Sequence, residues 1–274
     1  MNLKPEQIAR IADLEWASYV ATTATTRVTP GVEVIMRDDI VITTSQAFPS
    51  PDVNHACLLR ATPQGVDSLI AETIEHFESK GVPTTIFVSP ACTPADLSEH
   101  LSRRGFVEQP TGDAWLTLDL LNFEMPILPP VGIVTREIMA HETLTFAEIF
   151  MAAFEMPVAF APYMVQILEP SMNLPIIHHY MALVDEQPVG ICTMLYHENT
   201  CILGSAGVLP THRKSGAATY LAVKAMTEAR EQGADTVIVQ TASGGWLERV
   251  LCANGFEKVF TRTCYVLPDQ GQYS

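Results

Sequence analysis

The chain has 274 residues, 47% of them hydrophobic, and its 16 Lys+Arg against 31 Asp+Glu give a formal net charge of −15. This acidic balance argues against nucleic acid or an anionic membrane as a partner, and it suits a cationic amine as a substrate. No apolar run approaches the roughly 18 residues of a membrane-spanning helix. The N-terminal residues also lack the hydrophobic core of a signal peptide.

The six cysteines are scattered along the chain and form no Cys-x-x-Cys pair. At this chain length the pattern favours free thiols in a reducing cytoplasm over a disulfide framework or a zinc site. The adjacent His178 and His179 do not change the expectation that no metal is bound. Neighbouring residues of a strand point to opposite faces of a sheet, so the two rings cannot easily share one ion.

The first 120 residues alternate between strand and helix patterns. Apolar residues recur at helical spacing in the segments 5–19, 66–79 and 94–103. Apolar runs bounded by turn residues predict strands at 32–36, 40–44, 56–60, 84–88 and 115–120. The Thr-rich stretch 21–29 is expected to be a connection. Residues 122–131 contain three prolines and are expected to link two domains, residues 1–126 and 127–274.

The second half begins with the same alternation. Strands are predicted at 133–139, 176–184, 189–196, 201–208 and 236–240, and helices are predicted up to about residue 156 and at 157–168. A further helix places Leu221, Ala225 and Ala229 on one face, with Gly233 as its C-terminal stop. The last helix ends at Asn254-Gly255-Phe256.

The most informative stretch joins the strand that ends at Val208 to the helix that follows it. It reads Val208-x-Pro210-x-x-Arg213-x-x-Gly216-x-Ala218, with His212 and Lys214 beside the arginine. The first N–H groups of a helix have no partner inside it and carry the positive end of its dipole, so they bind phosphate oxygens readily. Small residues allow a pyrophosphate to approach the backbone, and an arginine adds a forked donor.

This stretch resembles the cofactor motif of the GNAT superfamily of N-acetyltransferases, and the flanking strands and helices resemble those of the family. The resemblance implies an α/β (α+β) fold with a mixed, mostly antiparallel sheet flanked by helices. It implies acetyl-CoA as co-substrate, held along a bulged strand by backbone pairing, with the N–H of Val208 as a donor to the oxyanion. The implied cofactor-binding residues are Ala206, Gly207, Val208, His212, Arg213, Lys214, Ser215, Gly216, Ala217 and Ala218.

The order of elements in the second half also occurs in the first, and Leu101-x-x-x-Gly105-Phe106 matches Leu251-x-x-x-Gly255-Phe256. We interpret this as a diverged internal repeat of two GNAT-like halves. Before its first long helix the N-terminal half has only Ala61-Thr-Pro-Gln-Gly65, without a basic turn. We therefore expect the first half to be degenerate and to hold no cofactor.

The catalytic residues are harder to assign. Many members of the family have a tyrosine as general acid at the position of Leu251, and leucine cannot donate a proton. Cys252 and Tyr220 are the candidates that remain, followed by Tyr196 and Tyr265. A base could be His197, Glu198 or water.

The acceptor and the functional class also stay open. Paired helices of the family cover the acceptor pocket, where Phe154, Phe160, Tyr163 and Met164 would lie, although each of these residues also suits a core. We expect a monomer or homodimer that transfers the acetyl group to a primary amine of a small molecule, peptide or protein by direct attack. The alternative is a non-catalytic acyl-CoA-binding sensor module.

Overall fold

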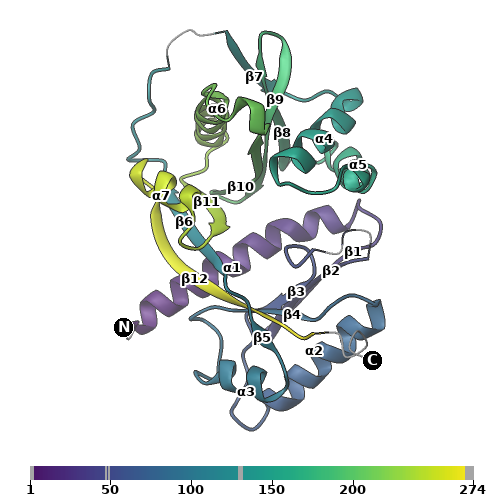
Figure 1. Ribbon diagram of the computed structural model, residues 1–274. Coiled ribbons are helices and arrows are strands. Elements are labelled where there is room, and N and C mark those ends of the chain that lie inside the picture. The colour runs from purple at the N-terminus through teal and green to yellow at the C-terminus, as the bar shows by residue number, and fades with distance from the viewer. Residues whose placement is uncertain (1–2, 47, 49, 129–131, 269–274) are drawn as a thin grey trace. The chain divides into compact units, whose positions relative to one another are not determined.

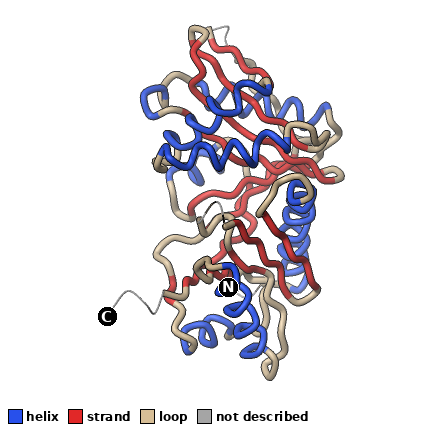
Figure 2. Tube along the Cα trace, turned by 90° about the vertical axis from the view of Figure 1, so that its right-hand side faces the viewer, coloured by secondary structure: helices blue, strands red, loops and turns tan. Residues whose placement is uncertain are grey.

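The computed structural model describes residues 3–46, 48, 50–128 and 132–268 (Figure 1). The chain forms two compact units. Unit 1 comprises residues 1–26, 31–116 and 240–274, and unit 2 comprises residues 27–30 and 117–239. Each unit contains a mostly antiparallel sheet with helices packed on it (Figure 2). The predicted α/β architecture is confirmed.

The helices and strands of unit 1 come from both ends of the chain. The helices are α1 (Pro5–Thr26), α2 (Val66–Lys80), α3 (Leu97–Arg103) and α7 (Trp246–Ala253). The strands are β1 (Val32–Arg37), β2 (Ile40–Ser45), β3 (His55–Cys57), β4 (Thr85–Val88), β5 (Val107–Glu108) and β12 (Glu257–Val266), and β6 (Asp113–Asp119) begins in this unit. Strands β1, β2, β3, β4 and β12 lie in this order, and only the β3–β4 pair among them is parallel.

The core of unit 1 lies between this sheet and α2. Ile70, Phe77, Ile86 and Leu101 are fully buried there, as the apolar spacing of residues 66–79 predicts. Helix α2 ends at Gly81, whose φ of +68° closes the helix with backbone hydrogen bonds to Glu78 and Phe77.

The Thr-rich stretch 21–29 is not simply the predicted connection, because α1 continues to Thr26. The hydroxyl groups of Thr22, Thr23, Thr25 and Thr26 donate to backbone carbonyl groups three or four residues earlier. These bonds satisfy the polar side chains within the helix, so the low helix propensity of threonine is overridden.

A buried arginine ties α1 to β12. Arg262 donates to the Tyr19 hydroxyl at 2.8 Å and to Asp113 at 2.5 Å, and it lies 3.4 Å from the Glu15 carboxylate. Its guanidinium also stacks over the Phe87 ring, 4.4 Å from the centroid. A buried charge requires an opposite charge and hydrogen bonds, and the two Nη atoms of Arg262 have both, whereas its Nε has no acceptor among the described residues.

Unit 2 contains the elements of the predicted second half up to residue 239. Its helices are α4 (Thr143–Ala153), α5 (Ala161–Ser171) and α6 (Ala217–Glu231), with short 3-10 turns η1 (Ala140–Glu142), η2 (Val158–Phe160) and η3 (Pro210–His212). Its strands are β7 (Ile133–Glu137), β8 (Ile177–Val184), β9 (Gln187–His197), β10 (Thr200–Val208) and β11, which begins here (Thr236–Ala242). The order is β11-β10-β9-β8-β7, and only β10–β11 is parallel.

Helices cover both faces of the unit 2 sheet. Phe146 of α4 packs edge-on against His179 of β8, whereas burial and the charge of the α6 residue Glu228 raise the pKa of the adjacent Tyr180 hydroxyl. Successive strand residues point to opposite faces, so α4 and α6 lie on opposite sides of the sheet, as Figure 1 shows. The predicted face of α6 is confirmed, since Leu221, Ala225 and Ala229 are buried. Gly233, with φ of +86°, follows this helix.

The two compact units do not coincide with the predicted domains 1–126 and 127–274. Residues 240–274 cluster with the N-terminal residues, because Thr263–Val266 of β12 pair antiparallel with Thr85–Val88 of β4. The last three residues of the predicted linker 122–131 lie outside the described residues. The predicted domains describe a repeat in the sequence, and this repeat remains a prediction.

Candidate active site

Strand β10 is irregular, in agreement with the bulged strand that the resemblance implies. Its pairing with β9 shifts register between Gly204 and Gly207, and Ser205 between them has φ of +49°. Its parallel pairing with β11 runs from Thr200 to Leu203. Among the described residues of unit 2, the segment 204–208 therefore has a ladder partner only in β9, which leaves its other edge available for backbone pairing.

The turn after β10 leads directly into α6. The His212 N–H donates to Leu209 and the Ser215 N–H donates to His212, which forms a tight turn around Arg213 and Lys214. Gly216 follows with φ of +91°, a conformation that favours glycine. A Cβ atom there would meet only Ile133, at 3.7 Å, so the backbone angle rather than crowding accounts for the glycine.

The first turn of α6 keeps free donors. The Ala217 N–H donates to the Ser215 hydroxyl at 3.2 Å, while the N–H groups of Thr219 and Tyr220 donate to the carbonyl of Gly216. Within the described parts of the chain, the N–H groups of Gly216 and Ala218 have no acceptor. These two donors lie at the positive end of a 15-residue helix, an arrangement that attracts anions in proteins.

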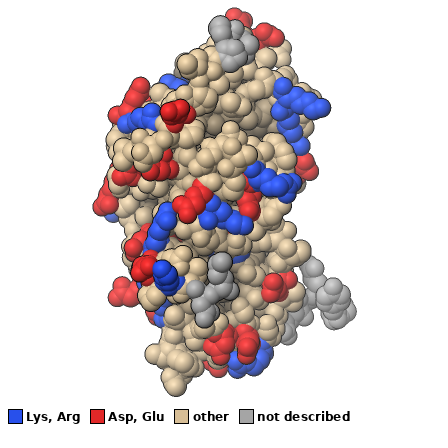
Figure 3. All heavy atoms as spheres, turned by 90° about the vertical axis from the view of Figure 1, so that its left-hand side faces the viewer, with Lys and Arg blue, Asp and Glu red and all other residues tan. Residues whose placement is uncertain are grey.

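Two exposed basic side chains flank these donors. Lys214 is exposed, and Arg213 is 53% exposed, with its Nη2 3.5 Å from the Glu155 carboxylate and 3.4 Å from the carbonyl of Ala153. His212 contacts the Thr211 hydroxyl through Nδ1. On the face drawn in Figure 3, basic and acidic side chains are scattered among uncharged ones and form no large patch of one sign.

The end of α4 packs against the bulged part of β10. A Cβ atom on Gly207 would lie 2.7 Å from the Cβ of Ala153 and 3.3 Å from the Phe154 ring. Only glycine allows the helix to approach this closely. The strand edge, the basic turn and the end of α4 thus meet within unit 2.

The four predicted acceptor-pocket residues differ in exposure. Phe154 and Tyr163 are 46% and 41% exposed, and Phe160 is half-buried with its ring 6.2 Å from that of Tyr163. Met164 is buried, so it belongs to the core of unit 2. Of the other three, Phe154 follows the end of α4, Phe160 belongs to η2 and Tyr163 lies in the first turn of α5.

Three of the candidate acid and base residues lie at the far end of β10. Tyr196 and His197 are the last residues of β9 and Glu198 lies in the turn before Thr200, and Tyr196 pairs with Cys201. The nine residues of β10 from Thr200 to Val208 span about 25 Å. Burial also raises the pKa of the Tyr196 hydroxyl. These three residues cannot reach a reaction at Val208.

The other candidates lie on helices or in unit 1. Tyr220 is half-buried in the first turn of α6, and Cys252 is exposed on α7 beside Leu251. Tyr265 of β12 donates to the Glu108 carboxylate at 2.9 Å, which engages its hydroxyl.

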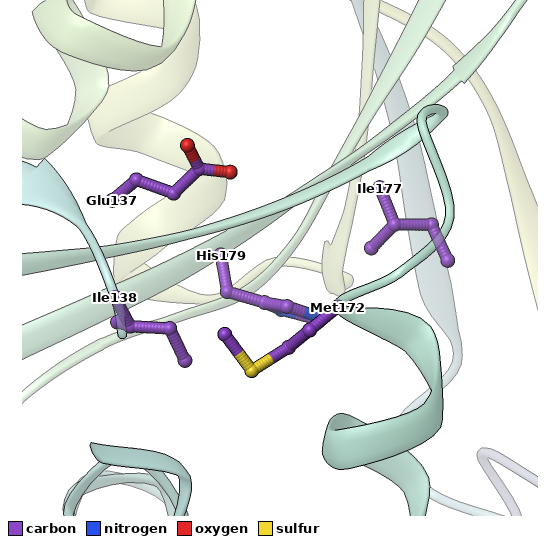
Figure 4. A pocket seen from close by; sticks show the side chains of 5 residues that line it. All are labelled: Glu137, Ile138, Met172, Ile177 and His179. Atoms are coloured by element: carbon purple, nitrogen blue, oxygen red, sulfur yellow. The ribbon is translucent and has the colours of Figure 1, made fainter. Parts of the chain in front are cut away.

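The two adjacent histidines have separate partners. His178 contacts the Glu137 carboxylate at 2.9 Å, whereas His179 is buried between the hydroxyls of Ser171 and Thr193. Burial lowers the pKa of His179 to about 4. Figure 4 shows its ring at a small pocket lined by Glu137, Ile138, Met172, Ile177 and His179. The neutral ring serves to connect α5 to the sheet.

In the first half, the strand edge that the predicted repeat relates to residues 204–208 is hydrogen-bonded to another segment of the chain. The Thr93 N–H donates to Leu59 at 2.8 Å and the Ala61 N–H donates to Thr93, so a neighbouring segment fills the strand edge after β3. At the start of α2, the N–H groups of Gly65 and Val66 both donate to Thr62. The N–H groups of Asp67 and Ser68 also have no acceptor among the described residues, but Asp67 places a carboxylate in the first turn of α2, whereas α6 is preceded by Arg213 and Lys214.

Comparison with known proteins found a family model that matches part of the chain. Residues 144–248 match the model of the acetyltransferase (GNAT) family. No curated protein sequence matches the chain. Among the described helices, none is long and apolar enough to cross a membrane.

Solved structures resemble the whole chain. A GCN5-related N-acetyltransferase from Kribbella flavida is 16% identical with a TM-score of 0.69, and the match covers 93% of this chain and 97% of that one. A tandem GNAT protein from the clavulanic acid biosynthesis pathway is 15% identical with a TM-score of 0.64, over 90% and 86% of the chains. A GCN5-related N-acetyltransferase from Sphaerobacter thermophilus is 14% identical with a TM-score of 0.60, over 85% and 81%.

At these identities the solved structures establish the fold, and the family match identifies the domain. The protein is by class an acyltransferase. Residues 144–248 are a domain of the GNAT acetyltransferase superfamily, and the chain as a whole has the fold of its members.

Proposed function

We propose that the chain transfers an acetyl group from acetyl-CoA to the primary amine of a small molecule, peptide or protein. The observation that carries the proposal is the pair of free N–H groups of Gly216 and Ala218 at the start of α6, beside Arg213. A pyrophosphate suits this arrangement, because its oxygens can accept hydrogen bonds from both backbone N–H groups and from the guanidinium of Arg213. Gly216 leaves room for it to approach.

Ten residues would hold the co-substrate. The open edge of β10 at Ala206, Gly207 and Val208 would pair with the amides of the pantetheine arm as an added strand. The phosphates would lie against the turn and first helical residues, which are His212, Arg213, Lys214, Ser215, Gly216, Ala217 and Ala218. Arg213 is the residue whose charge contributes most, because guanidinium binds phosphate through two parallel bonds.

The proposed reaction is direct attack of the neutral amine on the thioester carbonyl. The carbon–nitrogen bond forms, the carbonyl oxygen becomes an oxyanion, and the carbon–sulfur bond then breaks. The N–H of Val208 is the proposed donor to the oxyanion. The leaving thiolate takes a proton, for which Tyr220 and Cys252 remain the candidates, and the amine proton leaves to water.

A non-catalytic acyl-CoA-binding sensor is the second candidate. It is favoured by one feature, the leucine at position 251, where many family members have a tyrosine. Both functions need the same phosphate site. Acceptor-stimulated release of coenzyme A separates them, because a sensor would bind acetyl-CoA without turnover.

We also propose the cellular compartment, the division into domains and the oligomeric state of the protein. The six cysteines are free thiols, which suits a reducing cytoplasm. The sequence repeat supports a degenerate N-terminal domain, residues 1–126, and a catalytic domain, residues 127–274. We expect a monomer or a homodimer that binds neither nucleic acid nor a membrane.

The experiment that tests the function combines binding with turnover. Acetyl-CoA is titrated calorimetrically into the wild type and Arg213→Ala, and a library of amines is screened for release of free thiol. A hydrogen bond to a charged group is worth roughly 1.5–3 kcal/mol, so Arg213→Ala should weaken binding about ten- to a hundredfold. Arg27→Ala, at an exposed arginine of the same unit, should bind like the wild type. Wild-type affinity in a folded Arg213→Ala protein would contradict the proposal.

A further inference from the structure

Arg213, the main phosphate-binding residue of the proposed function, is already engaged by the end of α4. Its Nη2 donates to the carbonyl of Ala153 at 3.4 Å and lies 3.5 Å from the Glu155 carboxylate. Ala153 is the last residue of α4. Carbonyl groups at a helix C-terminus lack partners and carry the negative end of the dipole, so they attract a cation.

The backbone holds Glu155 in this place. Its φ of +57° is a left-handed conformation that a non-glycine residue adopts only when its surroundings impose it. The next N–H, of Met156, donates back to Met151 at 2.8 Å and so closes the end of the helix. The backbone of Glu155 is therefore fixed by the end of the helix.

The same helix end contacts the strand on which the thioester would lie. Ala153 and Phe154 pack on Gly207 so closely that a Cβ there would overlap with Ala153. The short segment 153–156 thus contacts both Arg213 and Gly207. A movement of this segment would therefore also change the packing at Gly207.

We propose that Glu155 and the Ala153 carbonyl hold Arg213 in the cofactor-free protein, and that the phosphates of acyl-CoA compete with them for its guanidinium. Binding of the co-substrate then releases the helix end, residues 153–156, next to the strand where the reaction takes place. This inference rests on the proposed function. Glu155 acts as an inhibitory contact that lowers the affinity for acyl-CoA.

The expected change in affinity for acyl-CoA follows from the solvent exposure of Arg213 and Glu155. The side chains of Arg213 and Glu155 are 53% and 78% exposed, so water and salt screen their attraction. Exposed ion pairs are weak, and Glu155→Gln should therefore tighten binding by only about two- to fivefold. Such a change is measurable and should disappear at high salt.

Coenzyme A is the probe, titrated into the wild type, Glu155→Gln and the control Glu148→Gln. Glu148 is exposed on the same helix and forms no ion pair with Arg213 among the described residues, so its variant removes the same charge without touching the contact. We expect tighter binding only in Glu155→Gln. Equal affinity of the three proteins would overturn the inference but leave the proposed function intact. A wild type that does not bind coenzyme A would overturn both.

A double variant separates the contact from simple repulsion between Glu155 and the phosphates. If Glu155 acts through Arg213, Glu155→Gln should have no effect on affinity in an Arg213→Ala background. An equal gain in both backgrounds would assign the effect to repulsion and overturn the proposal. A loss of kcat at unchanged affinity would instead place Glu155 in the chemistry, which also overturns it.

Amide hydrogen exchange reports the release of the helix end directly. Residues 154–156 should exchange faster in cofactor-free Arg213→Ala than in the cofactor-free wild type. Coenzyme A should accelerate exchange of these amides in the wild type. Protection of this segment by coenzyme A would contradict the proposal, because it would mean that the ligand covers the segment instead of freeing it.

Discussion

The backbone N–H of Thr93 donates to the carbonyl oxygen of Leu59 at 2.8 Å, and this bond closes a strand edge of the first half. The sequence repeat relates that edge to the segment 204–208 of β10, which has no such partner among the described residues of unit 2. Self-pairing satisfies the backbone groups that a bound amide chain would need. This difference between the two edges supports the proposal that the co-substrate binds in the second half.

We expect one molecule of acetyl-CoA per chain, bound in the second half. Calorimetric titration measures the stoichiometry. In Arg213→Ala the single binding event should weaken, and no second event should remain. Two equivalent events per chain would show that the first half binds the co-substrate as well.

Gly216 should tolerate alanine better than aspartate. Alanine has room but must adopt a φ of +91°, so it should cost roughly 1–2 kcal/mol of stability. Aspartate adds a negative charge beside the free N–H groups. We expect it to weaken acetyl-CoA binding more than tenfold beyond the alanine variant, since it loses a charge-assisted bond and adds repulsion. Thermal melting of both variants separates affinity from stability, and equal affinities would contradict the phosphate site.

Gly207→Ala should disturb the contact between β10 and α4. Its Cβ would lie 2.7 Å from that of Ala153, so helix or strand must shift, at a cost of about 1–3 kcal/mol. Gly204→Ala is the matched control in the same strand, where a Cβ meets nothing within 4 Å. Chemical denaturation should show a loss of stability only at position 207. Equal stability of both variants would mean that the helix end is not packed on the strand.

His179 should make the protein less stable in mild acid. Burial lowers its pKa from 6.5 to about 4, so the native state keeps the ring neutral while the unfolded chain takes up a proton. The stabilisation is present above pH 6.5 and is lost as the pH falls from 6.5 towards 4. At about pH 5 the loss should be about 1–2 kcal/mol. Denaturation curves at about pH 7 and pH 5 measure this loss of stability. His179→Gln should reduce the difference in stability between the two pH values. An unchanged difference would contradict a neutral buried ring.

Cys252 should not be essential for acid catalysis. It is exposed on α7, and a single cysteine more often has no chemical role than a catalytic one. Cys252→Ala should keep acetyl transfer within a few-fold of the wild type, whereas loss of a general acid costs about a hundredfold or more. The matched test at the other candidate is Tyr220→Phe, which removes only the hydroxyl group. A hundredfold loss at position 252 with intact binding of acetyl-CoA would identify the cysteine as the acid.

Local sequence patterns determined most elements and the candidate phosphate site. The spacing of Leu221, Ala225 and Ala229 indicated the buried face of α6, and Gly216 and Gly233 marked its ends. These features depend on residues within one or two turns of each other, so periodicity and backbone preference are enough to predict them.

Only the tertiary structure decided which distant residues meet. Arg262 of β12 is buried against Glu15 and Tyr19 of α1, and β12 pairs with β4, although more than 150 residues separate these elements in the chain. The engagement of Arg213 by the end of α4 and the closure of the Leu59 edge by Thr93 are likewise contacts between separate segments. No local pattern encodes such pairings, because they depend on how sheets and helices pack, and packing is determined by the whole chain at once.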